Sequence, residues 1–249
     1  MSLKYRPEID GLRAIAVFAV ILYHAEFNFG SYNPFKGGFI GVDVFFVISG
    51  YLITSILLRE MSEGKFNFTR FYERRARRIL PALFTVMSAS LPFAYYTMLP
   101  KAVIEYAGSI LSVLAFGSNI WFWREDSYWA APSALKPFLH TWSLSVEEQF
   151  YVFFPIILLL LYKFAQRYIT AIFAFGFLFS LLLSHFGSAY FPKATFFLLP
   201  TRAWELLAGV VLAKIEIEEG RMGRPFLDFV MPIISLPVTF SNVLRGKDK

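Results

Sequence analysis

The sequence predicts an all-α polytopic membrane protein, a bundle of seven or eight hydrophobic segments. Apolar residues make up 57% of the 249 residues and aromatic residues 19%, and the mean hydropathy is +0.53, which is too high for a typical soluble domain. Several apolar runs reach the roughly 20 residues that a helix needs to cross the hydrocarbon core. Since the stretches between them are too short for a separate soluble core, we expect residues 1–249 to form a single integral-membrane domain.

Eight runs bounded by charges, prolines or glycines are candidate helices. In chain order they are Gly11–Phe29, Gly38–Leu58, Ile79–Leu99, Ala102–Trp123, Trp142–Tyr162, Tyr168–Phe186, Thr195–Ala213 and, with a weaker pattern, Phe226–Leu244. The first run contains Arg13 and His24 and no clear small-residue cleavage site, so we interpret it as a retained helix rather than a secretory signal. Pro81 falls near the first turn of the third run, and Pro92 predicts a kink in it.

Basic residues predict the orientation, because Lys and Arg concentrate in cytoplasmic loops. The segment from Arg59 to Arg78 contains seven of them: Arg59, Lys65, Arg70, Arg74, Arg75, Arg77 and Arg78. We therefore expect this loop and the amino terminus to be cytoplasmic. The net charge of +6 reflects such short loops and not a nucleic-acid surface. Ala102–Trp123 either crosses fully or is re-entrant, and the re-entrant version places more basic residues inside.

Ionisable residues within membrane helices are costly and are therefore functional candidates. Arg13 and His24 are eleven positions apart, so an α-helix places them on one face about three turns apart. We expect Arg13 near the cytoplasmic mouth and His24 past the middle of the first helix. The alternative is that Arg13 only reaches lipid headgroups and His24 only bonds to a neighbouring helix.

A second polar cluster runs from His140 to Tyr151 and continues into an apolar helix. Its adjacent carboxylates, Glu147 and Glu148, require partners in a membrane. If Ala102–Trp123 is re-entrant, this helix enters from the outside and Glu147 falls about 8–10 Å below its start, a depth similar to that predicted for His24. A histidine and a glutamate at one depth can act as a base and its orienting group. Alternatively, both carboxylates only stabilise the amino end of the helix.

Two further sets of charged residues allow either a structural or a functional interpretation. Arg75 and Arg78, one turn apart, can bind the phosphates of a cytoplasmic donor, or the cluster can serve as a lipid-facing anchor. Arg202 and Glu205 can neutralise each other or line a pathway with Glu148.

Several chemistries lack their sequence signals. There are no cysteines, no G-x-S-x-G elbow, no glycine-rich phosphate loop and no H-E-x-x-H motif. The three histidines are too scattered to predict a metal site. Ser49 has no local base, so we interpret it as a small residue for close helix packing.

Together these segments resemble bacterial acyltransferase family 3, the integral-membrane O-acyltransferases of lipopolysaccharide O-antigen, peptidoglycan and related cell-envelope glycans. The matching stretches are Ile9 to Arg13 with His24, Gly41 to Tyr51, Arg74 to Pro81, Ser118 to Ile120, and His140 to Tyr151. The resemblance implies a cytoplasmic acyl-CoA donor, usually acetyl-CoA, with no resident cofactor. It also implies a glycan or lipid-linked glycan acceptor on the outer face of the bacterial inner membrane.

The resemblance also implies roles for particular residues. It places the essential histidine at His24, its paired arginine at Arg13 and the donor motif at Arg75 and Arg78. Asp43 and Glu147 match further motif positions. Because the family usually has about ten helices and often a periplasmic SGNH domain, we expect this chain to be incomplete at its carboxyl end.

The resulting hypothesis has the three arginines holding the donor while His24 deprotonates the acceptor or carries the acyl group, with Glu147 or Asp43 orienting its ring. The alternatives are a glycan or small-molecule transporter whose charges line a pathway without chemistry, and an inactive remnant.

Overall fold

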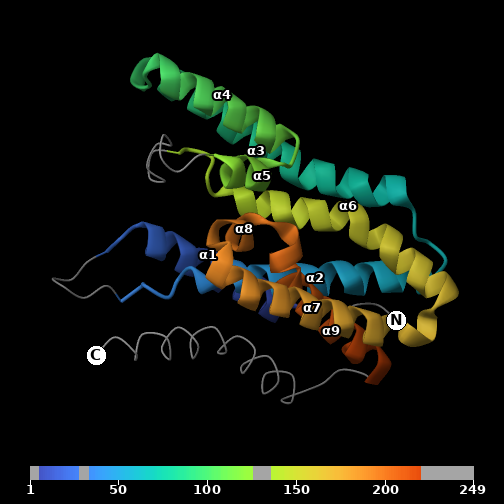
Figure 1. The fold of residues 1–249 in the computed structure, drawn as a ribbon. Helices are drawn as coiled ribbons and strands as arrows, with labels where there is room; N and C mark the ends of the chain where they lie inside the picture. Colours follow the sequence, from blue (N-terminus) through green and yellow to red (C-terminus); the bar gives the residue numbers. More distant parts are fainter. Residues whose placement is uncertain (1–5, 28–33, 126–135, 220–249) are drawn as a thin grey trace, which may run out of the picture. The chain divides into compact units, whose positions relative to one another are not determined.

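A computed structural model describes residues 6–27, 34–125 and 136–219, and the secondary structure within these ranges is helical (Figure 1). Five helical stretches of the described chain are long and apolar enough to cross a membrane. They are α2 (Ile40–Ser62), α3 (Phe68–Thr97), α6 (Thr141–Phe164), η2 with α7 (Gln166–Tyr168 and Ile169–Tyr190), and α8 with α9 (Pro192–Phe197 and Leu199–Glu219). The all-α polytopic class is therefore confirmed. The candidate Phe226–Leu244 lies outside the described residues.

The chain divides into two compact units. The first contains α1 (Pro7–His24), α2 as far as Ser55, and α9 from Glu205 onward. The second, residues 56–204, contains α3, α4 (Pro100–Leu114), α5 (Ser118–Arg124), α6, α7 and α8. The prediction of a single integral-membrane domain stays a prediction.

In the first unit, α1 and the start of α2 run antiparallel and approach closely because two glycines lie between them. A Cβ at Gly38 would come 2.2 Å from the carbonyl oxygen of Ala19, and a Cβ at Gly41 would come 2.3 Å from that of Ala16. Glycine without a Cβ permits this backbone contact. The two helices therefore form a tight pair at the end where α1 finishes and α2 begins.

The helix α1 is shorter at its carboxyl end than the predicted Gly11–Phe29. It begins at Pro7 and ends at His24, because Glu26 adopts a left-handed conformation with φ of 50°. His24, which was expected past the middle of this helix, is its last residue. With three charged residues in its 18, α1 is also not among the five apolar stretches.

Close packing of α2 against α9 depends on a second pair of glycines. A Cβ at Gly50 would lie 2.0 Å from the carbonyl oxygen of Leu206, and one at Gly209 would lie 2.0 Å from that of Val47 and 2.5 Å from the amide nitrogen of Tyr51. The close contact predicted at Ser49, which is itself buried, therefore falls on the neighbouring Gly50. Sequence pattern located the small residues but not the one that touches the partner helix.

Replacement of Gly209 by alanine should destabilise the protein. Alanine usually stabilises a helix relative to glycine by roughly 1 kcal/mol, but here the methyl group would overlap two backbone atoms, and overpacking of this kind costs about 1–3 kcal/mol. Thermal unfolding in detergent should show a lower midpoint for Gly209→Ala. The control is Gly11→Ala, because Gly11 is also helical but a Cβ there has no neighbour within 4 Å. Equal midpoints for the two variants would contradict the packing argument.

An ion-pair network joins the three helices of the first unit at the start of α1. Arg6 donates to both carboxylate oxygens of Glu216, at 2.9 and 3.1 Å, and to the hydroxyl of Tyr51. The Tyr51 hydroxyl in turn donates to Glu216 at 2.5 Å. The network ties the beginning of α1 to α2 and α9.

In the second unit, α4 folds back along the carboxyl half of α3 (Figure 1). The hydroxyls of Ser90 and Tyr106, which lie on opposite sides of this hairpin, are 2.7 Å apart. The amino half of α3 packs on α6, where the hydroxyl of Tyr72 donates to the carbonyl oxygen of Val152 at 2.9 Å. The helix α3 thus connects α4 to α6.

The third predicted run, Ile79–Leu99, begins much too late. The helix α3 starts at Phe68, and Asn67 caps it by accepting a hydrogen bond from the amide of Arg70 at 3.0 Å. Asparagine is a preferred amino-terminal cap because its side chain satisfies a free amide of the first turn. The arginines from Arg70 to Arg78 therefore lie on a helix and not in a loop, and Pro81 lies inside α3.

The fourth predicted run, Ala102–Trp123, is not one helix. It breaks after Leu114, where Phe116 adopts a left-handed conformation with φ of 49° and the amide of Gly117 donates to the carbonyl oxygen of Ser112 at 2.8 Å. Gln149 of α6 fixes this break by donating to the carbonyl oxygen of Phe116 at 2.9 Å. Since the 15 residues of α4 extend only about 22 Å, a full crossing by one continuous helix is excluded.

The other boundaries agree more closely with the predicted runs. The ends of α2, α6 and α7 lie within about one turn of the ends of Gly38–Leu58, Trp142–Tyr162 and Tyr168–Phe186. Thr195–Ala213 is the exception, because the short α8 ends at Phe197 and α9 begins at Leu199. The intervening Leu198 has an extended backbone conformation that interrupts the helix.

Candidate active site

The imidazole of His24 is exposed at the carboxyl end of α1. Its Nδ1 lies 2.9 Å from the carbonyl oxygen of Val20, and its ring contacts the edge of the Tyr23 ring at a centroid distance of 4.9 Å. A carbonyl oxygen can only accept, so the proton of the neutral ring is on Nδ1 in this contact. In this tautomer the lone pair is on Nε2, the atom that a general base would use.

Contacts between α1 and α2 place Asp43 between the levels of Arg13 and His24. Tyr23 contacts Phe39 at a centroid distance of 5.7 Å, and Arg13 lies 5.1 Å from the ring of Phe45. Asp43 lies in the sequence between Phe39, which precedes α2, and Phe45, and is half-buried in the first turn of the helix. The first unit thus brings three of the predicted site residues to one helix pair.

At the basic end of the second unit, acidic side chains neutralise four of the seven cations. Glu63 pairs with Arg59 at 3.0 Å and with Lys65 at 2.9 Å. Hydrogen bonds from Lys65 and Arg59 lower the pKa of Glu63, which lies in the turn after α2, to about 2. The remaining pairs are Arg74 with Glu60 at 2.7 Å and Arg77 with Glu73 at 2.8 Å. Among the described residues, no carboxylate pairs within 4 Å with Arg70, Arg75 or Arg78.

Arg75 lies against α6, the helix that carries the two adjacent glutamates. Its guanidinium lies 4.1 Å from the centroid of the Tyr151 ring, a cation–π contact. The buried hydroxyl of Tyr151 donates to the carboxylate of Glu147 at 2.5 Å. Arg75, Tyr151 and Glu147 therefore form a connected chain from the surface of α3 into the interior of the unit.

Glu148, next to this chain, is buried and incompletely satisfied. Its Oε1 has no hydrogen-bond partner among the described residues, although the carboxylate interacts electrostatically with Arg75 and Arg78. A buried carboxylate is stable only with charge or hydrogen-bond compensation. The two arginines supply the charge, and Oε1 can still accept a hydrogen bond.

Arg202 is held by aromatic rings and a backbone oxygen. Its guanidinium lies 5.5 Å from the Trp142 ring centroid and 5.1 Å from that of Phe196, and its Nε donates to the carbonyl oxygen of Phe196 at 3.1 Å. Glu205 is fully buried on α9. Mutual neutralisation of Arg202 and Glu205 stays a prediction.

The structure groups the predicted site residues in two sets. Arg13, His24 and Asp43 belong to the first unit, whereas Arg75, Arg78, Glu147 and Glu148 belong to the second. Glu147 bonds to Tyr151 beside the arginines, and its convergence with His24 stays a prediction. Within the described ranges, no group of three His, Asp or Glu side chains could hold a metal ion.

Two features of the site are missing from the sequence predictions. Tyr151 links the arginines to Glu147, and the only signal for it was the i, i+4 spacing of Glu147 and Tyr151. A buried polar network also holds α5 on α6: the Ser118 and Ser145 hydroxyls are 2.7 Å apart, and Gln149 donates to Asn119 at 2.8 Å. The Ser118–Asn119 stretch therefore has a structural role.

The long apolar helices define a polytopic membrane protein. Residues 6–233 match the family model described as an acyltransferase domain, so the chain belongs to acyltransferase family 3.

Curated relatives support this membership. The chain is 35% identical over 220 residues to the peptidoglycan O-acetyltransferase OatA of Listeria monocytogenes, covering 86% of this chain and 34% of the relative. It is 36% identical over 222 residues to the O-acetyltransferase OatA of Staphylococcus aureus, covering 86% and 35% respectively. The chain thus spans about a third of the length of these relatives. No solved structure matches it significantly.

Proposed function

We propose that this chain is the membrane part of an O-acetyltransferase that moves an acetyl group from cytoplasmic acetyl-CoA to a hydroxyl of a cell-envelope glycan of the peptidoglycan type. The observation that carries the proposal is a pair of arginines on α3, Arg75 and Arg78, which form no ion pair within 4 Å among the described residues. The neighbouring Arg74 and Arg77, in contrast, are neutralised by glutamates. The relatives named as O-acetyltransferases support the reaction and the acceptor class.

The arginine pair suits the phosphates of a CoA donor. Guanidinium groups one helical turn apart can make charge-assisted, bidentate hydrogen bonds to phosphate oxygens. Stacking on Tyr151 holds Arg75 in place before the donor arrives, and Glu148 Oε1 can accept a hydrogen bond from an amide or amino group of the donor. Arg13, on α1, would contribute further positive charge at the thioester.

His24 supplies the chemistry at the acceptor. With the proton on Nδ1, the Nε2 lone pair can remove the proton of an attacking hydroxyl or attack the thioester itself. Asp43, at the neighbouring level of α2, would stabilise the positive charge that the ring gains. In either route the acyl carbon bonds to the glycan oxygen, and CoA leaves as a thiol after receiving the proton.

The proposed membrane orientation assigns the donor arginines and His24 to opposite sides of the membrane. We propose that the basic turn between α2 and α3 is cytoplasmic, with the amino terminus on the same side of the bacterial inner membrane. The end of α1 and the start of α2 then lie toward the outer face. A donor held at the basic end and an acceptor beside His24 would then come from opposite faces of the membrane.

Mass spectrometry of the cell-wall glycan tests the proposal. We expect glycan from cells carrying the intact gene, in its natural reading frame, to contain acetyl esters that are missing after deletion of the gene. Loss of whole glycan, with no change in esterification, would instead indicate transport. Unchanged glycan would contradict the proposed acceptor.

A further inference from the structure

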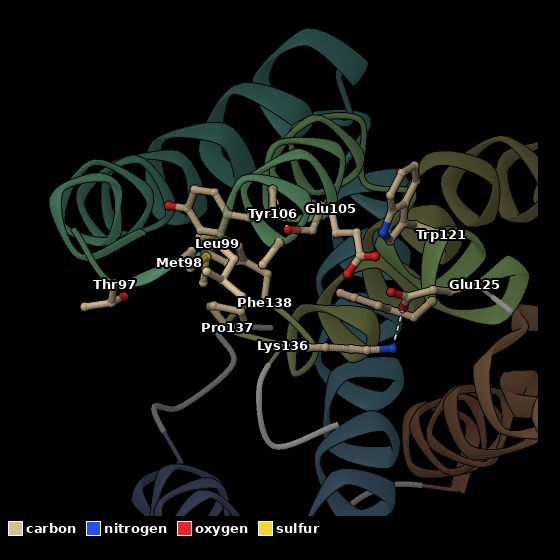
Figure 2. A pocket seen from close by; sticks show the side chains of 13 residues that line it. Thr97, Met98, Leu99, Glu105, Tyr106, Trp121, Glu125, Lys136, Pro137 and Phe138 are labelled. Atoms are coloured by element: carbon tan, nitrogen blue, oxygen red, sulfur yellow. Dashed lines mark hydrogen bonds and ion pairs between the residues drawn. The ribbon is translucent and has the colours of Figure 1, made fainter. Parts of the chain in front are cut away.

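A cavity of about 310 Å³ lies in the second unit, and no arginine is among its lining residues (Figure 2). It is formed where the α3–α4 turn meets α5 and the residues leading into α6. Its walls include four aromatic side chains, Tyr106, Trp121, Phe122 and Phe138, and two carboxylates, Glu105 and Glu125. At this size it is near the lower end of ligand-binding sites.

The polar groups of the cavity differ in their pairing. Glu125 is neutralised by Lys136 at 2.6 Å, and both side chains are mostly buried. Glu105 is half-buried, and no described residue donates a hydrogen bond to it or forms an ion pair with it. One carboxylate with free acceptor capacity therefore lines an otherwise aromatic and charge-balanced cavity.

This chemistry favours a neutral ligand with several hydrogen-bond donors. The net charge of the lining is −1, which disfavours phosphates and thus the proposed CoA donor. A sugar ring presents hydroxyl or amide donors that Glu105 can accept and an apolar face that can pack on Trp121. The Trp121 ring is itself held against α4, since a Cβ at Gly108 would come 2.4 Å from it.

We propose that this cavity binds one sugar residue of the glycan acceptor, with Glu105 as hydrogen-bond acceptor and Trp121 as packing surface. The inference rests on the proposed function, because it supplies that reaction's acceptor subsite. The chain order agrees with it: α2 carries the chain from the proposed outer side to the basic turn, and α3 carries it back. The cavity at the end of α3 therefore belongs to the outer side, where the acceptor is expected.

Binding of β-1,4-linked N-acetylglucosamine tetramer to the purified chain in detergent tests the proposal. We expect saturable binding that weakens at least tenfold in Glu105→Gln, an isosteric change that keeps the side chain but removes its charge, and in Trp121→Ala. The matched control is Trp123→Ala, two residues further along α5, exposed and outside the cavity lining. This control should bind like the unaltered protein.

Acetyl-CoA binding is measured on the same samples, so that the subsite and the reaction can fail separately. Retained acetyl-CoA binding in all variants together with the predicted loss of tetramer binding supports the subsite. Equal tetramer binding by all four proteins would overturn the subsite while leaving the proposed function intact. Binding of glycerophosphoethanolamine without binding of the tetramer would also overturn it, because the cavity would then hold a lipid headgroup. Absence of acetyl-CoA binding would count against the proposed function instead.

Discussion

Replacement of His24 by alanine should abolish glycan acetylation by the protein expressed in its natural reading frame. If His24 is the general base, its loss should reduce the rate about 10²- to 10⁴-fold, and if it carries the acyl group, no transfer should remain. Because His24 is exposed at the end of α1, its truncation leaves no buried cavity, so the protein should still accumulate in the membrane. The measurement is the ester content of cell-wall glycan, normalised to protein level.

A histidine outside the proposed site provides the control. His185 is exposed on α7, and His185→Ala should acetylate glycan like the unaltered protein. Intact-mass analysis of purified protein after incubation with acetyl-CoA separates the two roles of His24, since only an acyl carrier gains an acetyl group. Normal acetylation by His24→Ala would remove this residue from the reaction.

Replacement of Arg75 by alanine should weaken acetyl-CoA binding by about ten- to a hundredfold. Hydrogen bonds to a charged group contribute roughly 1.5–3 kcal/mol, and the variant also loses the cation that compensates Glu148. Arg75→Lys should recover only part of the affinity, because lysine keeps the charge but not the bidentate geometry or the planar stacking on Tyr151. Titration of the purified chain with acetyl-CoA gives the affinities.

The control for lost positive charge is Arg70→Ala, five residues earlier on α3. Arg70 is exposed and is also without an acidic partner among the described residues, so a merely electrostatic surface effect would weaken binding equally in both variants. If the site is specific, we expect Arg70→Ala to bind acetyl-CoA as tightly as the unaltered protein does. Equal losses, or no loss in Arg75→Ala, would return the cluster to a role in membrane orientation.

Sequence periodicity was reliable for helices whose ends are marked by local chemistry. The runs now seen as α2, α6 and α7 were predicted within about a turn, because long apolar stretches between charges leave few alternatives in a membrane. It failed where polar residues continue a helix, as in the first turns of α3, or where a break is fixed from elsewhere. Phe116 ends α4 in a left-handed conformation that its own side chain does not favour, and Gln149 of α6 bonds to its carbonyl oxygen.

The site was predicted by residue type but not by connection. Buried charge is costly in a membrane, so Arg13, His24, Glu147 and Glu148 were evident as candidates from the sequence. Their contacts were not, since nothing in the sequence predictions named the bond between Tyr151 and Glu147. A carboxylate bonds to whichever donor packing brings within about 3 Å, and that distance does not follow from depth along a helix.

The sequence by itself determined that the chain is a helical membrane protein and singled out ionisable residues such as Arg13, His24 and Glu147 as candidates, because hydropathy and residue spacing are local properties. Tertiary packing decided which glycines touch a neighbouring backbone, which arginines are neutralised and which remain available. It also formed the cavity around Glu105 and Trp121. Each of these depends on side chains far apart in the chain, whose distances are fixed only when the helices pack.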